Sequence, residues 1–75
     1  MLASDFKTGK CYNMFIPKFD KKVSFKFIGY LGGEYDIIGT DCETGKRIHF
    51  STMIMKRLYF DEAIEIDCSN CKGFD

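Results

Sequence analysis

The chain has 75 residues, and its eleven basic and eleven acidic side chains give a formal net charge of zero. A chain of this length forms one small domain that buries roughly 60% of its unfolded surface, so we expect its eight Phe and four Tyr residues to supply much of the apolar core. Zero net charge disfavours nucleic-acid binding through bulk charge, because such binding requires several phosphates to be neutralised.

Two targeting features are not apparent in the sequence. No apolar run approaches the ~20 residues that a membrane-spanning helix needs, and no apolar stretch behind a basic N-terminus indicates a signal peptide. We therefore expect a cytoplasmic protein without a membrane partner, in which cysteines are free thiols or metal ligands rather than disulfides.

The first predicted strand spans residues 10–16, an apolar and β-prone segment that Pro17 ends. Residues 1–9 before it are expected to form an N-terminal extension. The polar segment 18–22 suits an exposed loop between the first two strands.

Residues 23–51 predict three consecutive strands joined by two turns. Apolar and polar side chains alternate over residues 23–31, as in a half-buried strand, and Gly32 and Gly33 provide the positive φ angles of a tight hairpin. The second strand spans residues 35–40. It leads into a turn in which Gly45 suits a left-handed position, and the third strand spans residues 46–51.

Two interpretations of residues 52–66 remain open at this point. In the first, a short helical turn precedes a last strand over residues 63–67, where apolar and charged side chains alternate. In the second, one continuous helix covers the segment, because Met55 and Tyr59 lie on one helical face. We favour the first, and we expect residues 69–75 to form a C-terminal tail.

This order of elements, with its Asp-x-x-Thr-Gly-Lys hairpin at residues 41–46, resembles the SH3-like small barrels, including the KOW, Tudor and Sm-type groups. The resemblance covers residues 10–68. It implies a mostly β, single-domain protein over residues 1–75: an SH3-like barrel of about five antiparallel strands, with one short helical turn before the last strand. It also implies a compact binding module, although a fold alone does not assign a function.

The cysteines are the only residues whose spacing indicates metal chemistry. Cys68 and Cys71 have the C-x-x-C spacing that lets two thiolates share one tetrahedral ion. If the last strand runs antiparallel to the first, Cys11 joins them, but a fourth zinc ligand is unaccounted for and Cys42 is expected to lie far away in a hairpin tip. We favour the simpler interpretation, in which Cys11 is a small core residue, the other two belong to a loose tail and no cofactor is bound.

Catalytic residues are not apparent, so we predict that the protein is not an enzyme. His49 lies on the strand face opposite Ile48 and Phe50 without an evident nucleophile beside it. Gly29, Gly32 and Gly33 lie in a predicted hairpin rather than in a phosphate-binding loop between a strand and a helix.

Two functions from different classes remain. The first is a non-catalytic protein-interaction module, such as a regulator or inhibitor of a larger enzyme complex of the sort that viruses encode. Its apolar side chains outnumber what so small a barrel can bury, so we expect a protein partner or a second copy of the chain to contact them. The predicted interface residues are Met53, Met55, Tyr59, Phe60, Ile28 and Tyr30.

The alternative is a small barrel that binds nucleic acid through basic side chains, with aromatic side chains stacking on the bases. The predicted contact residues are Lys18, Lys21, Lys22, Lys26, Lys46 and Arg47. Salt dependence separates the two functions, because nucleic-acid affinity falls steeply as salt rises.

Overall fold

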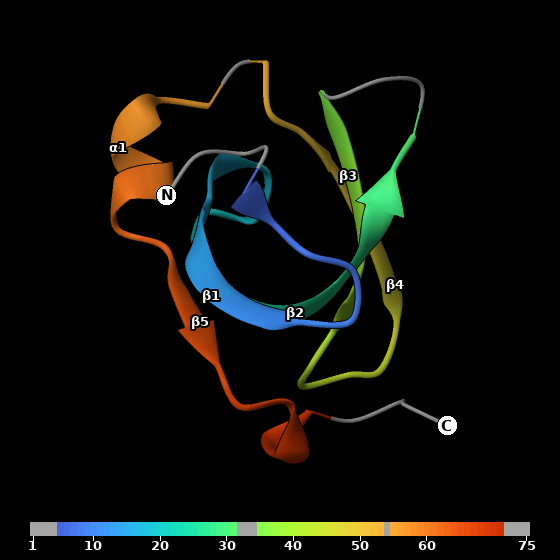
Figure 1. The fold of residues 1–75 in the computed structure, drawn as a ribbon. Helices are drawn as coiled ribbons and strands as arrows, with labels where there is room; N and C mark the ends of the chain where they lie inside the picture. The colour runs from blue at the N-terminus through green and yellow to red at the C-terminus, as the bar shows by residue number, and fades with distance from the viewer. Residues whose placement is uncertain (1–4, 32–34, 54, 72–75) are drawn as a thin grey trace.

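The computed structural model describes residues 5–31, 35–53 and 55–71. Five strands form one antiparallel sheet in the order β4-β3-β2-β1-β5 (Figure 1). The strands are β1 (Cys11–Ile16), β2 (Lys21–Tyr30), β3 (Asp36–Asp41), β4 (Arg47–Ser51) and β5 (Ile64–Ile66). The helical segments are the 3-10 turns η2 (Pro17–Phe19) and η3 (Cys68–Asn70) and the helix α1 (Arg57–Asp61).

This architecture confirms a mostly β protein with five antiparallel strands and one short helix before the last strand. Residues 52–66 contain α1 and β5 rather than one continuous helix. Across the described ranges, β4 and β5 are the two edges of the sheet and do not pair with each other, so the sheet is open and not a closed barrel. No helix among these residues is long and apolar enough to cross a membrane.

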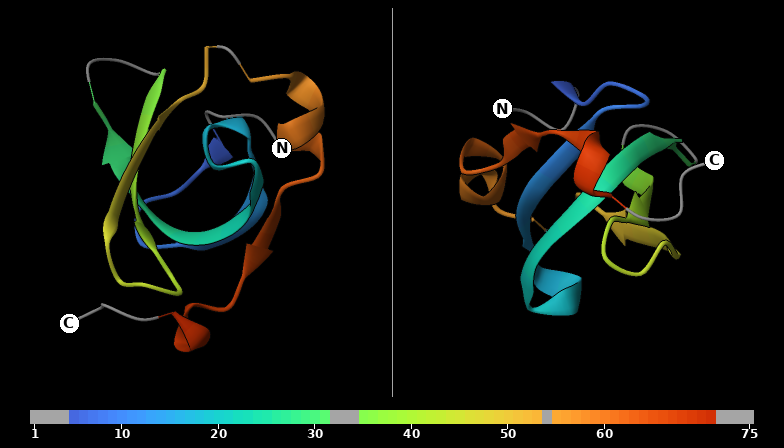
Figure 2. Two further views of the ribbon diagram at one scale, coloured as in Figure 1. Left: turned by 180° about the vertical axis from the view of Figure 1, so that it is seen from behind. Right: turned by 90° about the horizontal axis from the view of Figure 1, so that it is seen from below.

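The core lies inside the curved sheet, with β3 and β4 on one side of the interior and α1 on the other (Figure 2). Alternate residues of β1, β2, β3 and β4 contribute to the interior, as the period-2 pattern predicts. The buried cluster consists of Phe6, Tyr12, Met14, Ile16, Val23, Phe25, Phe27, Ile37, Phe50, Phe60 and Ala63. Six of these side chains are aromatic, so aromatic contacts supply much of the core.

The segment before β1 contributes to this core, although we expected residues 1–9 to be an extension. The Phe6 side chain is only 5% exposed, and its ring centroid lies 4.5 Å from that of Tyr12. The N–H of Gly9 donates to the carbonyl of Phe27 at 2.9 Å, and the N–H of Phe27 donates to the carbonyl of Lys10 at 2.9 Å. Residues 6–10 are therefore packed onto the domain.

We expect the Phe6→Ala substitution to lower the free energy of unfolding by about 3–5 kcal/mol, the usual cost of a phenylalanine-sized cavity. Leu58→Ala is the matched control, because the Leu58 side chain is 54% exposed, and should change stability by less than ~0.5 kcal/mol. Chemical denaturation measures both values. Equal effects of the two substitutions would contradict the burial of Phe6.

Glycine is required at two positions, one because of a positive φ angle and the other because of a close approach between strands. Gly45 has a φ of +76°, which confirms the left-handed turn position, and Asp41 stabilises the turn by accepting the N–H of Glu43 at 2.8 Å. The turn expected at Gly32 and Gly33 lies outside the described residues. At Gly39, an added Cβ would lie 2.8 Å from the backbone oxygen of Lys26 on the neighbouring strand.

The Gly39→Ala substitution should therefore destabilise the protein by about 1–3 kcal/mol, as overpacking does in other cores. Gly29→Ala is the control on the adjacent strand β2, since a Cβ there would meet nothing within 4 Å. It should change the unfolding free energy by less than ~0.5 kcal/mol. Thermal melts of both variants check the difference, and a neutral Gly39→Ala would contradict the close approach of β2 and β3.

Candidate functional site

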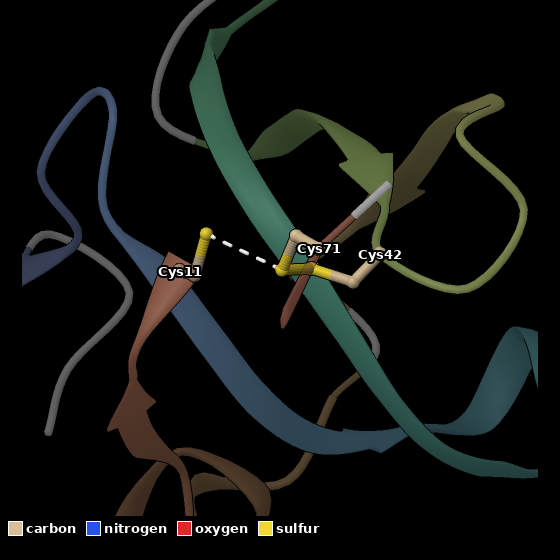
Figure 3. A group of neighbouring side chains, drawn as sticks. All are labelled: Cys11, Cys42 and Cys71. Carbon is tan, nitrogen blue, oxygen red and sulfur yellow. Dashed lines mark hydrogen bonds between the residues drawn. A yellow bond between two sulfur atoms is a disulfide. The ribbon is translucent and has the colours of Figure 1, made fainter. Parts of the chain in front are cut away.

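All four cysteines converge on one site. Cys11 begins β1, Cys42 directly follows β3, Cys68 begins η3 and Cys71 directly follows η3. Disulfides join Cys11 to Cys68 and Cys42 to Cys71. The sulfur atoms of Cys11 and Cys71, which belong to different disulfides, lie 3.6 Å apart across the outer face of β2 (Figure 3).

Strand pairing brings the start of β1 and the segment after β5 to this site. In the register between β1 and β5, Cys11 lies opposite Ile66, so the chain needs only two more residues to place Cys68 beside Cys11. The η3 turn then reverses the chain, with the N–H of Cys71 donating to the carbonyl of Cys68 at 3.0 Å.

Asp67 caps this turn. Its carboxylate accepts the N–H of Ser69 at 2.9 Å, and this hydrogen bond lowers the pKa of Asp67. Because the folded-state pKa is lowered, the contribution to stability is present at neutral pH and is lost as the pH falls through the lowered value. The cap therefore fixes the turn that carries both cysteines of the C-x-x-C motif.

Three expectations about the cysteines are wrong. Cys68 and Cys71 are cross-linked rather than part of a loose tail, the four thiols are paired rather than free, and Cys42 lies beside Cys71 rather than far away. Cys42 comes close because its N–H donates to the carbonyl of Ser24 at 2.8 Å. This bond holds the start of the β3–β4 hairpin against β2, whose other neighbour is the Cys11 strand.

Reduction should destabilise the protein, because the Cys11–Cys68 disulfide closes a loop with a sequence separation of 57. Losing a cross-link that closes a loop of this length lowers the free energy of unfolding by about 4 kcal/mol in the chain-entropy estimate. Urea denaturation with and without a phosphine reductant, both with a chelator present, measures the difference. A variant with all four cysteines replaced by alanine is the control and should not respond to reductant; an unchanged midpoint for the reduced native chain would contradict the cross-links.

A second feature is an apolar groove of about 330 Å³ beside β4. One rim is the η2 turn, the other is the edge of β4, and Met55 closes the groove from the segment before α1. The lining residues are Ile16, Pro17, Lys18, Asp36, His49, Phe50, Ser51 and Met55. The groove therefore lies where the open sheet leaves β4 without a neighbour.

The free edge of β4 presents backbone groups to this groove. The N–H of Asp41 donates to the carbonyl of Lys46, and the N–H of Thr52 donates to the carbonyl of Tyr35. Since hydrogen-bonded and non-hydrogen-bonded pairs alternate in an antiparallel ladder, the N–H and C=O groups at positions 47, 49 and 51 face away from β3. The ammonium group of Lys18 donates to one of them, the carbonyl of His49, at 2.7 Å.

The predicted interface residues are distributed between core and surface. Phe60 is only 6% exposed and belongs to the core, whereas Met53 is 71% exposed and Tyr30 is 37% exposed. Met55 and Tyr59 are half-buried against the core, and Ile28 is half-buried. Phe60 therefore belongs to the core and has almost no surface to offer a partner, whereas the other five residues stay predictions.

The predicted basic residues do not form one patch. Lys22 and Lys26 share the outer face of β2, and Arg47 joins them because Lys26 lies opposite Thr40, which in turn lies opposite Arg47. Lys18 instead lines the groove. Lys21 directly precedes Lys22 on β2, so the two side chains point to opposite faces of the sheet. Lys46 lies in the β3–β4 hairpin, where its N–H donates to the hydroxyl of Thr44.

His49 has an acidic neighbour in the groove. Its Nε2 atom lies 4.0 Å from a carboxylate oxygen of Asp36, an ion pair when the imidazole is protonated. The hydroxyl of Ser51, on the same strand, accepts the N–H of Met53 at 3.3 Å. Both side chains of the ion pair are exposed, so the pair contributes little to stability.

Comparison of the chain with protein-family models, with curated proteins and with solved structures gives no match. The geometry of the cysteine cluster and of the groove therefore carries the functional argument.

Proposed function

We propose that the protein is a non-catalytic interaction module that binds an extended segment of a partner protein along the free edge of β4. The observation that carries this proposal is the apolar groove beside β4 backbone groups that face away from β3, one of which, the carbonyl of His49, accepts a hydrogen bond from Lys18. A peptide strand added to a sheet edge gains main-chain hydrogen bonds, and adjacent pockets select its side chains.

The lining of the groove favours a particular peptide chemistry. The half-buried Pro17 and Met55 offer apolar surface, and the buried Ile16 and Phe50 line the groove from beneath. A volume of about 330 Å³ is near the lower end for ligand pockets. The groove thus accepts one or two apolar side chains. The Lys18 ammonium donates to a neutral carbonyl oxygen and lies over the Phe19 ring, without a carboxylate partner among the described residues. An acidic residue next to the apolar anchor would therefore complement its charge.

Several expectations remain predictions alongside this proposal. The order of the strands and the short helix before β5 support the resemblance to SH3-like small barrels, and a regulator or inhibitor of a larger enzyme complex is the role that such a module suits. Pairing of β4 with β4 of a second copy would give a homodimer. A cytoplasmic location is the expectation that the two disulfides oppose, since disulfides persist in oxidising compartments.

Peptide selection from a displayed library, followed by titration of the selected peptide and amide NMR, tests the proposal. We expect the amide chemical shifts of residues 47, 49 and 51 to change when the peptide binds. The affinity should change little as the salt concentration rises. His49→Pro removes an outward N–H from an edge position where proline is tolerated, and should weaken binding at least about tenfold through the lost hydrogen bond and the bulk of the ring. His49→Ala is the matched control, because it keeps the N–H and should bind nearly as well.

Other outcomes would contradict this assignment. Equal affinity of a folded His49→Pro variant would place the peptide elsewhere. A synthetic oligonucleotide that binds with a steep salt dependence and shifts Lys22, Lys26 and Arg47 would establish the nucleic-acid alternative. Sedimentation that gives a dimer through β4 would make the second copy the occupant of the groove.

A further inference from the structure

We infer that the reduced protein holds one Zn²⁺ ion with the four thiolates of Cys11, Cys42, Cys68 and Cys71. This inference does not depend on the proposed peptide-binding function. The sulfur atoms of Cys11, Cys42 and Cys71 all lie within 4.8 Å of one another, and the Cys68 sulfur is bonded to that of Cys11. Three sulfurs from three parts of the chain therefore already cluster, and the fourth, that of Cys68, is one bond away from the cluster through Cys11.

The spacing suits tetrahedral zinc. With Zn–S bonds of about 2.3 Å, the ligand sulfurs of a tetrahedral site lie roughly 3.8 Å apart, and the sulfurs of Cys11 and Cys71 are already 3.6 Å apart. After reduction, the two sulfurs of each former disulfide need only separate by rotation of their side chains. The backbone positions that carry them are fixed by β1, the β3–β4 hairpin and the η3 turn.

The surroundings also suit a structural metal centre. Cys11 is fully buried and Cys42 nearly so, whereas Cys68 and Cys71 are half-buried, so the ion would be shielded by the sheet and reached from the η3 side. The C-x-x-C pair lies on a capped turn, and this spacing places two thiolates on one ion. Cys42, which we expected to lie far away, supplies the fourth ligand that the sequence left unaccounted for.

The zinc and disulfide states exclude each other, and their interconversion balances. Each disulfide becomes two thiols by taking two electrons and two protons: a dithiol supplies both and becomes a disulfide, whereas a phosphine supplies the electrons, water supplies the protons and the phosphine leaves as its oxide. The four thiols then release four protons as they bind Zn²⁺. The ion would join the same three segments that the disulfides join, so the domain would stay cross-linked in a reducing compartment.

Metal titration of the reduced chain tests this inference. Protein reduced with a phosphine, freed of metal and kept under argon should bind one Co²⁺ per chain and show the visible absorption of tetrahedral cobalt with thiolate ligands. Zn²⁺ should displace the Co²⁺ and raise the melting temperature above that of the reduced, metal-free chain. His49→Ala, which alters the only histidine of the sequence, is the matched control and should leave the metal spectrum unchanged.

Cys42→Ser should lose the four-thiolate cobalt spectrum, and an unchanged spectrum would overturn the inference. X-ray absorption of the zinc-loaded native chain gives an answer even if that variant does not fold. Four sulfur neighbours at about 2.3 Å would support the site. A shell that contains nitrogen or oxygen, one metal for every two chains, or no uptake from excess Zn²⁺ would each overturn it.

Discussion

The antiparallel pairing of β5 with β1 is the contact on which the rest of this structure depends. It spans only three residue pairs, yet it places the segment after β5 beside the start of β1 and brings Cys68 to Cys11. A strand this short contributes few hydrogen bonds in a domain whose small size limits its core. The covalent links from Cys68 and Cys71 to β1 and to the β3–β4 hairpin therefore do what a larger core does in longer proteins.

The same pairing leaves β4 as an open edge of the sheet. Because β5 pairs with β1, the described part of β4 has one strand neighbour, β3, and its outward backbone groups need donors and acceptors from elsewhere. Lys18 supplies one donor from η2, and the space between η2 and β4 becomes the apolar groove. An unpaired edge and a groove beside it are thus one consequence of the open sheet.

The local pattern of the sequence predicted most of the fold but little of the site. The alternation of apolar and polar side chains predicted the strands, and Gly45 predicted its turn, because both features depend only on residues that are adjacent in the sequence. The burial of Phe6 and the approach of Cys42 to Cys71 depend on contacts across the sheet, which alternation does not encode. The helix starts at Arg57, and its position buries Phe60 and exposes Leu58, which the sequence pattern did not predict for Phe60. The groove follows from the open sheet, which the barrel resemblance did not predict.

The four cysteines connect the stability of the domain to its compartment. With two disulfides the chain is cross-linked in an oxidising environment, whereas reduction alone would remove both links from a domain with a small core. A zinc ion held by the same sulfurs would restore the connection among β1, the β3–β4 hairpin and η3 without changing which segments meet. Most groove residues lie on η2, β4 and the segment before α1, and the other two, Ile16 and Asp36, lie at the ends of β1 and β3 that are remote from Cys11 and Cys42. Neither form of the cysteine cluster therefore requires them to move. The edge of β4 would then be available to a partner in either compartment.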